Sequence, residues 1–220
     1  MKQVELVEDY PAKIAQMLLD GSIDAGLVPV AIIPRLSESY IISDYCIGAN
    51  GEVASVCIFS EVPLENAERI LLDYQSRTSA ALCKILLKHY WKLDIAIEDA
   101  KTDFANEIKG TTAGMLIGDR ALVKRNSATY MYDLAAAWKD FTGLPFVFAA
   151  WIANKKLPAG FIAAFNAANK EGLKHIHEVA AANENSAYNI HDYYTKNISY
   201  TLDEEKKKGM QKFLAMINEL

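Results

Sequence analysis

The sequence predicts an α/β protein of two lobes, with a cleft between them and a helical C-terminus. Three observations lead to this prediction. Short apolar runs typical of buried strands alternate with stretches whose apolar residues recur at helical spacing. Two such runs, "VASVCIFS" and "FVFAAWIA", enclose a segment of about 85 residues, which is enough for a small domain. Beyond Pro158 the pattern indicates helices alone.

The enclosed segment implies that the chain crosses between the lobes twice. We expect lobe I to comprise residues 1–59 and 148–220, and lobe II residues 60–147. Closure of two lobes about such a hinge seals a ligand from water. A single doubly wound domain is the alternative, but the helical C-terminal part must return beside the start of the chain, which favours two lobes.

Elements near the two ends follow from local patterns. The run "KQVELVEDYP" predicts a strand, "AKIAQMLLDG" a helix that ends at Gly21, and "IDAGLVPVAI" a second strand. This spacing predicts a parallel crossover, and ligands of such sheets bind at the carboxyl ends of the strands. Pro29 lies at one of these ends and is therefore a candidate ligand-binding residue. Thr201 and Glu204 form the pair expected to cap the last helix.

Four polar residues, Ser76, Arg77, Thr78 and Ser79, come where the apolar run "RILLDY" gives way to the helical pattern "AALCKILLKHYW". They are therefore expected to begin a helix, whose unpaired N–H groups and dipole attract a carboxylate or a phosphate. Capping is the alternative, since Ser and Thr favour that position. One residue suffices for a cap, so four in succession favour an anion site.

The segment "GMLIGDRALVKR" repeats this arrangement, with Gly118 and Asp119 between a short apolar strand and a helix. Gly118 permits a ligand to approach the backbone closely. Asp119 either caps its own helix or binds a substrate hydroxyl, and capping is the better founded interpretation for a single Asp. Two strand ends thus present polar groups to one ligand.

Composition excludes several classes of function. The chain has 220 residues, of which 51% are hydrophobic, so it can bury a sizeable core. Its formal charge of −5, without a basic cluster larger than residues 206–208, argues against nucleic acid as a partner. We find no apolar run of membrane-spanning length and no signal peptide at the N-terminus, so we expect no membrane association and a cytoplasmic location.

The sequence gives no sign of a metal site. Its three cysteines are odd in number, lie in apolar surroundings and lack C-x-x-C spacing, which favours reduced core thiols over disulfides or zinc ligands. His175 and His177 flank a single residue and would point to different sides of a helix, which suits neither zinc binding nor a shared base.

Several strings together resemble one known family. These are "DYCIGANGEVASVCIFSEVPLE", "LDYQSRTSAALCKILL", "MLIGDRAL", "YDLAAAWKDFTGLPFVFAAW" and "NISYTL". In this order, over nearly the whole chain, they are similar to the chorismate dehydratases of the futalosine route to menaquinone. The resemblance implies the periplasmic-binding-protein fold of the second type, used by a cytoplasmic lyase rather than a transporter.

The resemblance also implies a reaction. Chorismate loses water to give 3-[(1-carboxyvinyl)oxy]benzoate without a metal or an organic cofactor. Removal of the ring proton places negative charge on a conjugated carboxylate, so fixed donors around that carboxylate would stabilise the transition state. On this basis Ser76 and Thr78 are candidate oxyanion-type donors, and Arg77 and Ser79 bind substrate. Arg77 has an alternative of equal weight, in which it pairs with an acidic residue and braces the lobes.

Three further site residues rest on the family pattern, namely Asn50, Gly51 and Ser55. For Asn50 and Gly51 the alternative is a tight turn, which this dipeptide forms readily without any function. None of the matched motifs supplies a His or a poised carboxylate as base, so the enolpyruvyl carboxylate of the substrate is our candidate proton acceptor. Positioning would then be the main contribution of the protein.

Members of the family normally begin with another strand, a polar loop and a first helix, and this chain enters at what resembles their second strand. We expect the missing strand to lie in the middle of the sheet of lobe I. Its absence would leave two unpaired strand edges, so we expect low stability and weak catalysis.

Other functions remain open at this point. Dihydroxynaphthoate synthase of the same pathway shares the fold, but its family relies on a catalytic histidine that these motifs lack. A non-catalytic binder of small carboxylates and the effector domain of a transcription factor are further alternatives. The tyrosines at positions 188, 193 and 194 are interpreted as packing between terminal helices. A homodimer is left open.

Overall fold

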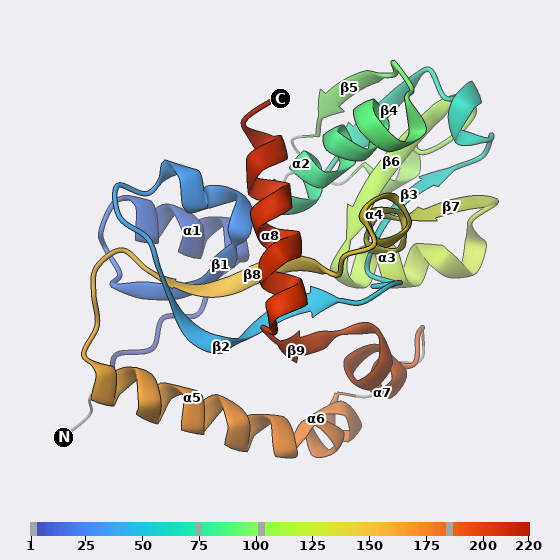
Figure 1. The fold of residues 1–220 in the computed structure, drawn as a ribbon. Coiled ribbons are helices and arrows are strands. Elements are labelled where there is room, and N and C mark those ends of the chain that lie inside the picture. Colours follow the sequence, from blue (N-terminus) through green and yellow to red (C-terminus); the bar gives the residue numbers. More distant parts are fainter. Residues whose placement is uncertain (1–3, 74–75, 101–103, 184–186) are drawn as a thin grey trace.

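The structure is a computed structural model and describes residues 4–73, 76–100, 104–183 and 187–220. It contains two β-sheets. The two sheets are visible side by side in Figure 1. The first sheet has the order β1 (Ala25–Pro29), β8 (Phe146–Ala153), β2 (Tyr40–Ala49) and β9 (Ser199–Thr201). The second has the order β5 (Ala96–Asp99), β4 (Arg69–Leu72), β6 (Thr112–Ile117), β3 (Val56–Ser60) and β7 (Tyr130–Asp133).

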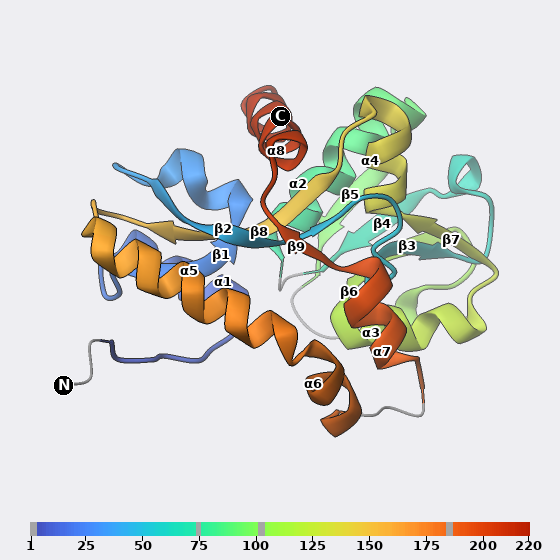
Figure 2. The ribbon, with the colours of Figure 1, turned by 60° about the horizontal axis from the view of Figure 1, so that its bottom comes forward.

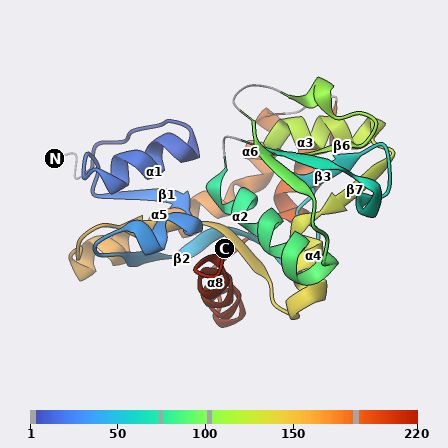
Figure 3. The same ribbon diagram turned by 90° about the horizontal axis from the view of Figure 1, so that it is seen from above.

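Helices connect and cover these strands. The α-helices are α1 (Pro11–Leu19), α2 (Arg77–Leu86), α3 (Gly118–Lys124), α4 (Leu134–Thr142), α5 (Ala159–Lys174), α6 (Ile176–Ala182), α7 (Ile190–Asp192) and α8 (Glu204–Ile217). Among the shorter turns, η1 (Val30–Arg35) follows β1, η3 (Leu87–Trp91) extends α2, and η6 (Tyr193–Asn197) extends α7. Viewed from above, α2 and α8 lie between the two sheets (Figure 3).

Strand directions determine which loops share an edge. In the first sheet β8 runs antiparallel to both β1 and β2, and β9 runs antiparallel to β2. In the second sheet β4 is parallel to β5 and β6, while β3 is antiparallel to β6 and β7. The carboxyl ends of β4 and β6 therefore open on the same edge as the start of β3. This edge carries the candidate site.

The expected parallel crossover at the N-terminus is wrong. Residues 4–10 form no strand and are exposed, and β1 pairs antiparallel with β8 instead. Leu6 is 78% exposed, so the apolar alternation there has no sheet to cover. Residues 2–3 of the expected strand lie outside the described part of the chain. The expected helix is present as α1, with Pro11 at its first turn, where a missing N–H costs nothing.

The C-terminal cap also differs from the expected one. Thr201 ends β9, opposite Tyr45 of β2, and is therefore unavailable to the helix. Asp203 caps α8 instead, because its carboxylate accepts a hydrogen bond of 2.8 Å from the Lys206 N–H. The described residues after Pro158 thus contain the short strand β9 in addition to the expected helices.

The chain changes sheets between β2 and β3 and returns after α4. The strand β3, expected in lobe I because of the boundary at residue 59, lies in the second sheet. Among the described strands β1 is an edge of the first sheet and pairs on one side alone, with β8. The place of the expected missing strand stays a prediction. The exact lobe ranges stay a prediction.

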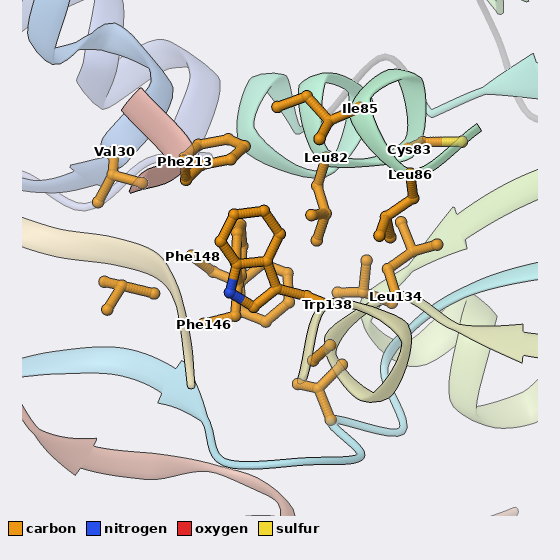
Figure 4. Packing of buried hydrophobic residues seen from close by; sticks show 14 of the residues in the cluster. Val30, Leu82, Cys83, Ile85, Leu86, Leu134, Trp138, Phe146, Phe148 and Phe213 are labelled. Carbon is orange, nitrogen blue, oxygen red and sulfur yellow. The ribbon is translucent and has the colours of Figure 1, made fainter. Parts of the chain in front are cut away.

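One large hydrophobic cluster joins the two sheets. Trp138 of α4 is fully buried at its centre, with ring centroids 5.4 Å from Phe146 and 6.2 Å from Phe213. Figure 4 shows Leu82 and Leu86 of α2 beside this aromatic group. A smaller cluster covers the other face of the second sheet, around Cys57, Phe59, Leu71, Phe104, Ile108, Leu116 and Ala121. The large cluster thus holds α2, and with it the residues at its N-terminus, in place.

Candidate functional site

The site begins where β4 ends. The Asp73 side chain is fully buried there and accepts a hydrogen bond of 3.3 Å from the Ile117 N–H. The same Asp73 oxygen lies 2.6 Å from Nη2 of Arg120, in the first turns of α3. Asp73 therefore connects the end of β4 to the end of β6, and the N-cap of α2 follows three residues later.

Ser76 is the N-cap of α2, as expected of a helix start. Its Oγ accepts a hydrogen bond of 3.2 Å from the Ser79 N–H and donates one of 2.8 Å to the Ser79 Oγ. The backbone N–H groups of Arg77 and Thr78 form no hydrogen bond within the ranges that the structure describes. Because Ser76 caps only the Ser79 N–H, the N–H groups of Arg77 and Thr78 are left to bind another acceptor.

Thr78 connects α2 to the other sheet. Its side chain is 1% exposed, and its Oγ1 accepts a hydrogen bond of 3.2 Å from the Ala31 N–H. Ala31 belongs to η1, which starts immediately after Pro29 at the end of β1. The structure thereby brings Pro29 and the first turn of α2 together, although they are far apart in the sequence.

The Nη1 atom of the Arg77 guanidinium is buried and has no hydrogen-bond partner among the residues that the structure describes. Burial, and next the positive charge of Arg35, lower the pKa of Arg77. Within the described part of the chain neither arginine forms an ion pair with an acidic residue, so nothing there supports the interpretation of Arg77 as a brace between the lobes. A buried cationic donor without an acceptor is suited to bind an anion.

A second group of polar residues lies next to the first. The Gly118 N–H donates a hydrogen bond of 2.8 Å to the Ser55 carbonyl, since β3 and β6 are neighbours. Gly118 has a φ of +60°, which a side chain rarely permits. The expected capping role of Asp119 is wrong, because α3 has no side-chain cap and Asp119 Oδ1 accepts a hydrogen bond of 2.9 Å from the Tyr188 hydroxyl.

Asn50 and Gly51 do not form a hairpin turn. The strands before and after them belong to different sheets. The dipeptide therefore starts the segment that connects the two sheets, residues 50–55, which we call the crossing. Gly51 has a φ of +122° there. Asn50 is exposed. Their binding role stays a prediction.

Asp133 holds this crossing, and sequence analysis missed it. Its carboxylate accepts hydrogen bonds from the N–H groups of Val53 and Ala54 and from two N–H groups of α4, with lengths of 2.7–3.2 Å. Burial raises the pKa of Asp133, while the backbone donors act in the opposite direction. The signal in the sequence was an Asp immediately before the helical run "LAAAWKDF".

Tyr193 and Tyr188 were also missed as site residues. The Tyr193 hydroxyl donates a hydrogen bond of 2.9 Å to the Ser55 Oγ, across 138 positions of the sequence. The expected packing between tyrosines is present as well, with the rings of Tyr188 and Tyr193 in edge contact at 6.4 Å. Figure 2 shows α7 beside α3, which explains how the C-terminal part reaches Asp119. No spacing rule relates residues so distant in the chain.

The site residues therefore form two adjoining groups. Ser76, Arg77, Thr78 and Ser79 lie near Pro29, and Ser55 lies with Gly118 and Asp119, joined through the Asp73 contact with Ile117. A hollow of about 580 Å³ lies elsewhere, at the C-terminal end of α2. Among the residues described, no cluster of three or more His, Cys, Asp or Glu is arranged to hold a metal ion. The group at the start of α2 consists of hydrogen-bond donors and a cation, which suit a carboxylate ligand.

The family of the chain follows from a sequence model. Residues 1–219 match the model of a family described as menaquinone biosynthesis. The chain belongs to the menaquinone biosynthesis family. A chorismate dehydratase of Thermus thermophilus is 29% identical, over 92% of this chain and 83% of its own length. One of Campylobacter jejuni is 31% identical, over 70% of this chain and 55% of its own length.

Solved structures support the predicted fold of this family member. A protein from Archaeoglobus fulgidus has a TM-score of 0.64 at 14% identity, over 97% of this chain and 84% of its own. The periplasmic aliphatic sulphonate binding protein of Escherichia coli has a TM-score of 0.57 at 12% identity, over 96% of this chain and 75% of its own. The predicted two-lobed, periplasmic-binding-protein-like fold is therefore confirmed. In the described residues no helix is long and apolar enough to span a membrane.

Proposed function

We propose that this member of the menaquinone biosynthesis family is a chorismate dehydratase, which converts chorismate to 3-[(1-carboxyvinyl)oxy]benzoate and water on the futalosine route, in the cytoplasm. The observation that carries the proposal is the Arg77 guanidinium, with a buried Nη1 that has no acceptor, at the start of α2. Chorismate is a dicarboxylate, and Arg35 supplies a second positive charge near Arg77. The names of the two relatives give the reaction.

The chemistry requires stabilisation of negative charge. The proton that leaves the ring carbon is acidified by conjugation to the ring carboxylate, so charge accumulates on that carboxylate. The N–H groups of Arg77 and Thr78 and the hydroxyl of Ser79 lie at one helix terminus and would donate to it. The Ser76 hydroxyl donates to the Ser79 Oγ and would orient it. One such donor contributes about 3 kcal/mol to transition-state stabilisation.

The proton acceptor in this proposal is the substrate itself. None of the residues gathered at the edge is a histidine. Asp73 is engaged by Arg120 and the Ile117 N–H, and Asp119 accepts from the Tyr188 hydroxyl. The enolpyruvyl ether, which carries the second carboxylate, is attached to the same ring carbon as the proton, so a clamp that fixes the orientation of that carboxylate would bring base and proton together. Arg77 is the residue that we assign to this clamp.

The test measures the aromatic product by chromatography and mass after incubation of the protein with chorismate. We expect product from the wild type and a loss of about 100-fold in kcat/KM for Arg77→Ala, with little recovery in Arg77→Lys, because a lysine cannot form a two-pronged contact. Arg69→Lys is the matched control, since Arg69 pairs with Glu98 on β5 and lies at the other end of β4. Its kcat/KM should equal that of the wild type.

Two results would contradict the proposal. Binding of chorismate without release of product would identify a non-catalytic carboxylate binder. A pH–rate profile governed by a protein group that titrates near pH 6 to 7 would identify a protein base and exclude the substrate as proton acceptor.

A further inference from the structure

The backbone on either side of Ser55 is held from several directions. The Glu52 carbonyl accepts a hydrogen bond of 3.2 Å from Asn197, and Asp133 binds the N–H groups of Val53 and Ala54. Ala54 has a φ of +66°, a conformation that costs energy for a residue with a side chain. Because the backbone of the crossing is fixed, the main freedom that remains at Ser55 is rotation of its hydroxyl group.

Tyr193 determines that direction in the structure. Its hydroxyl lies 2.9 Å from the Ser55 Oγ and is the donor of the hydrogen bond. Burial is the main cause that raises the pKa of Tyr193, so the phenol keeps its proton near neutral pH. Because Ser55 Oγ accepts from Tyr193, the Ser55 proton is left to bind a different acceptor. Ser55 is only 4% exposed, and a chain of hydrogen bonds strengthens each member in such surroundings.

The phenol of Tyr193 is itself fixed. Its ring is in contact with the rings of Tyr188, at 6.4 Å, and Tyr194, at 5.5 Å, and the Tyr188 hydroxyl binds Asp119. The segment η6, which begins with Tyr193, leads directly into β9 of the first sheet. Tyr193 therefore connects an element of the first sheet to the crossing that starts the second.

We propose that Tyr193 is a positioning residue of the ligand site, which turns the Ser55 hydroxyl so that its proton is donated to a carboxylate of the bound ligand. The inference rests on the proposed function for the identity of that ligand. In the alternative, Tyr193 only attaches the C-terminal segment, and its hydroxyl would then affect stability but not the site.

A double-mutant cycle separates these two roles. Tyr193→Phe, Ser55→Ala and the double variant are compared with the wild type, and Tyr194→Phe is the matched control, since Tyr194 has ring contacts but no hydroxyl hydrogen bond in the described residues. We expect Tyr193→Phe to lower kcat/KM for chorismate about tenfold, chiefly through kcat, and to have less than a twofold effect once Ser55 is Ala. The melting temperature is measured for every variant.

Full activity of Tyr193→Phe, or a tenfold loss that persists in the Ser55→Ala background, would overturn the inference. If the wild type forms no product from chorismate, the proposed function fails, and the same cycle is measured by calorimetry as the dissociation constant of sodium benzoate, the simplest ring carboxylate. A tenfold coupling between Tyr193 and Ser55 there sustains the inference. Additive effects, or no binding of benzoate, overturn it.

Discussion

Gly209 offers a sharp test of how α8 is seated between the sheets. This residue is buried within α8, and a Cβ added to it would lie 2.1 Å from the Pro145 carbonyl oxygen, in the loop that enters β8. Ordinary contacts of such an atom begin at 3.4 Å, so Gly209→Ala requires a displacement of 3.4 − 2.1 = 1.3 Å between the helix and that loop. The added Cβ is fixed to the helix backbone and its neighbour is a backbone oxygen, so neither atom can rotate away.

The expected magnitude combines two opposing effects. Alanine in a helix interior is favoured over glycine by about 1 kcal/mol, whereas overpacking of a tight contact costs about 1–3 kcal/mol. Because backbone meets backbone here, we take the upper end and expect a net loss of about 2 kcal/mol in the free energy of unfolding. For a chain of this size that loss lowers the melting temperature by about 6 °C.

The assay is thermal unfolding followed by circular dichroism, with urea unfolding as a second measure. Gly172→Ala in α5 is the matched control, since a Cβ there meets nothing within 4 Å. It should raise the melting temperature by about 3 °C through helix propensity alone. If Gly209→Ala stabilised the protein as much as Gly172→Ala, the close approach of α8 to Pro145 would be refuted.

Three further predictions concern buried and capping groups. Burial raises the pKa of Cys46 and of Cys83 to about 12 and that of Cys57 still further, so we expect no thiol to react with Ellman's reagent at pH 8 until denaturant is added. Asp133→Asn keeps an acceptor for α4 but removes the acceptor of the Ala54 N–H, and urea unfolding should show a loss of about 2 kcal/mol. The pKa of Asp203 is lowered, chiefly by the Lys206 N–H, so the stability that it contributes should be constant above about pH 4 and fade below it. A wild-type minus Asp203→Ala difference that stays flat down to pH 2 would contradict this.

Local signals predicted the start of α2 correctly, while its cap had been only the alternative to an anion site. The change from an apolar strand to helical spacing, with Ser76 at the junction, needs no distant partner to be interpreted, and the structure has this element as expected. The same kind of reasoning failed for residues 4–10, where an apolar alternation alone indicated a strand. A strand needs a neighbour to pair with, and residues 4–10 pair with none of the described strands, so β1 stays at the edge of the first sheet.

Contacts between distant segments were beyond sequence reasoning. The hydroxyl of Tyr193 and the side chain of Ser55 meet because η6 leads into β9, which adds to an edge of the first sheet. Nothing in the spacing of either residue encodes that approach. Asp133 is an intermediate case, since its position before a helix indicated a cap, but its bonds to the crossing depend on the fold.

The order of strands in the first sheet has a consequence for synthesis on the ribosome. β1 and β2 are made early but pair with β8 and not with each other, so neither gains its neighbour in this sheet until residues 146–153 have been translated. All strands of the second sheet lie between residues 56 and 133 and are complete before that point. At about 5–20 residues per second, the first sheet remains unassembled for several seconds after its early strands emerge. The half of the protein that begins the chain is therefore the half that folds last.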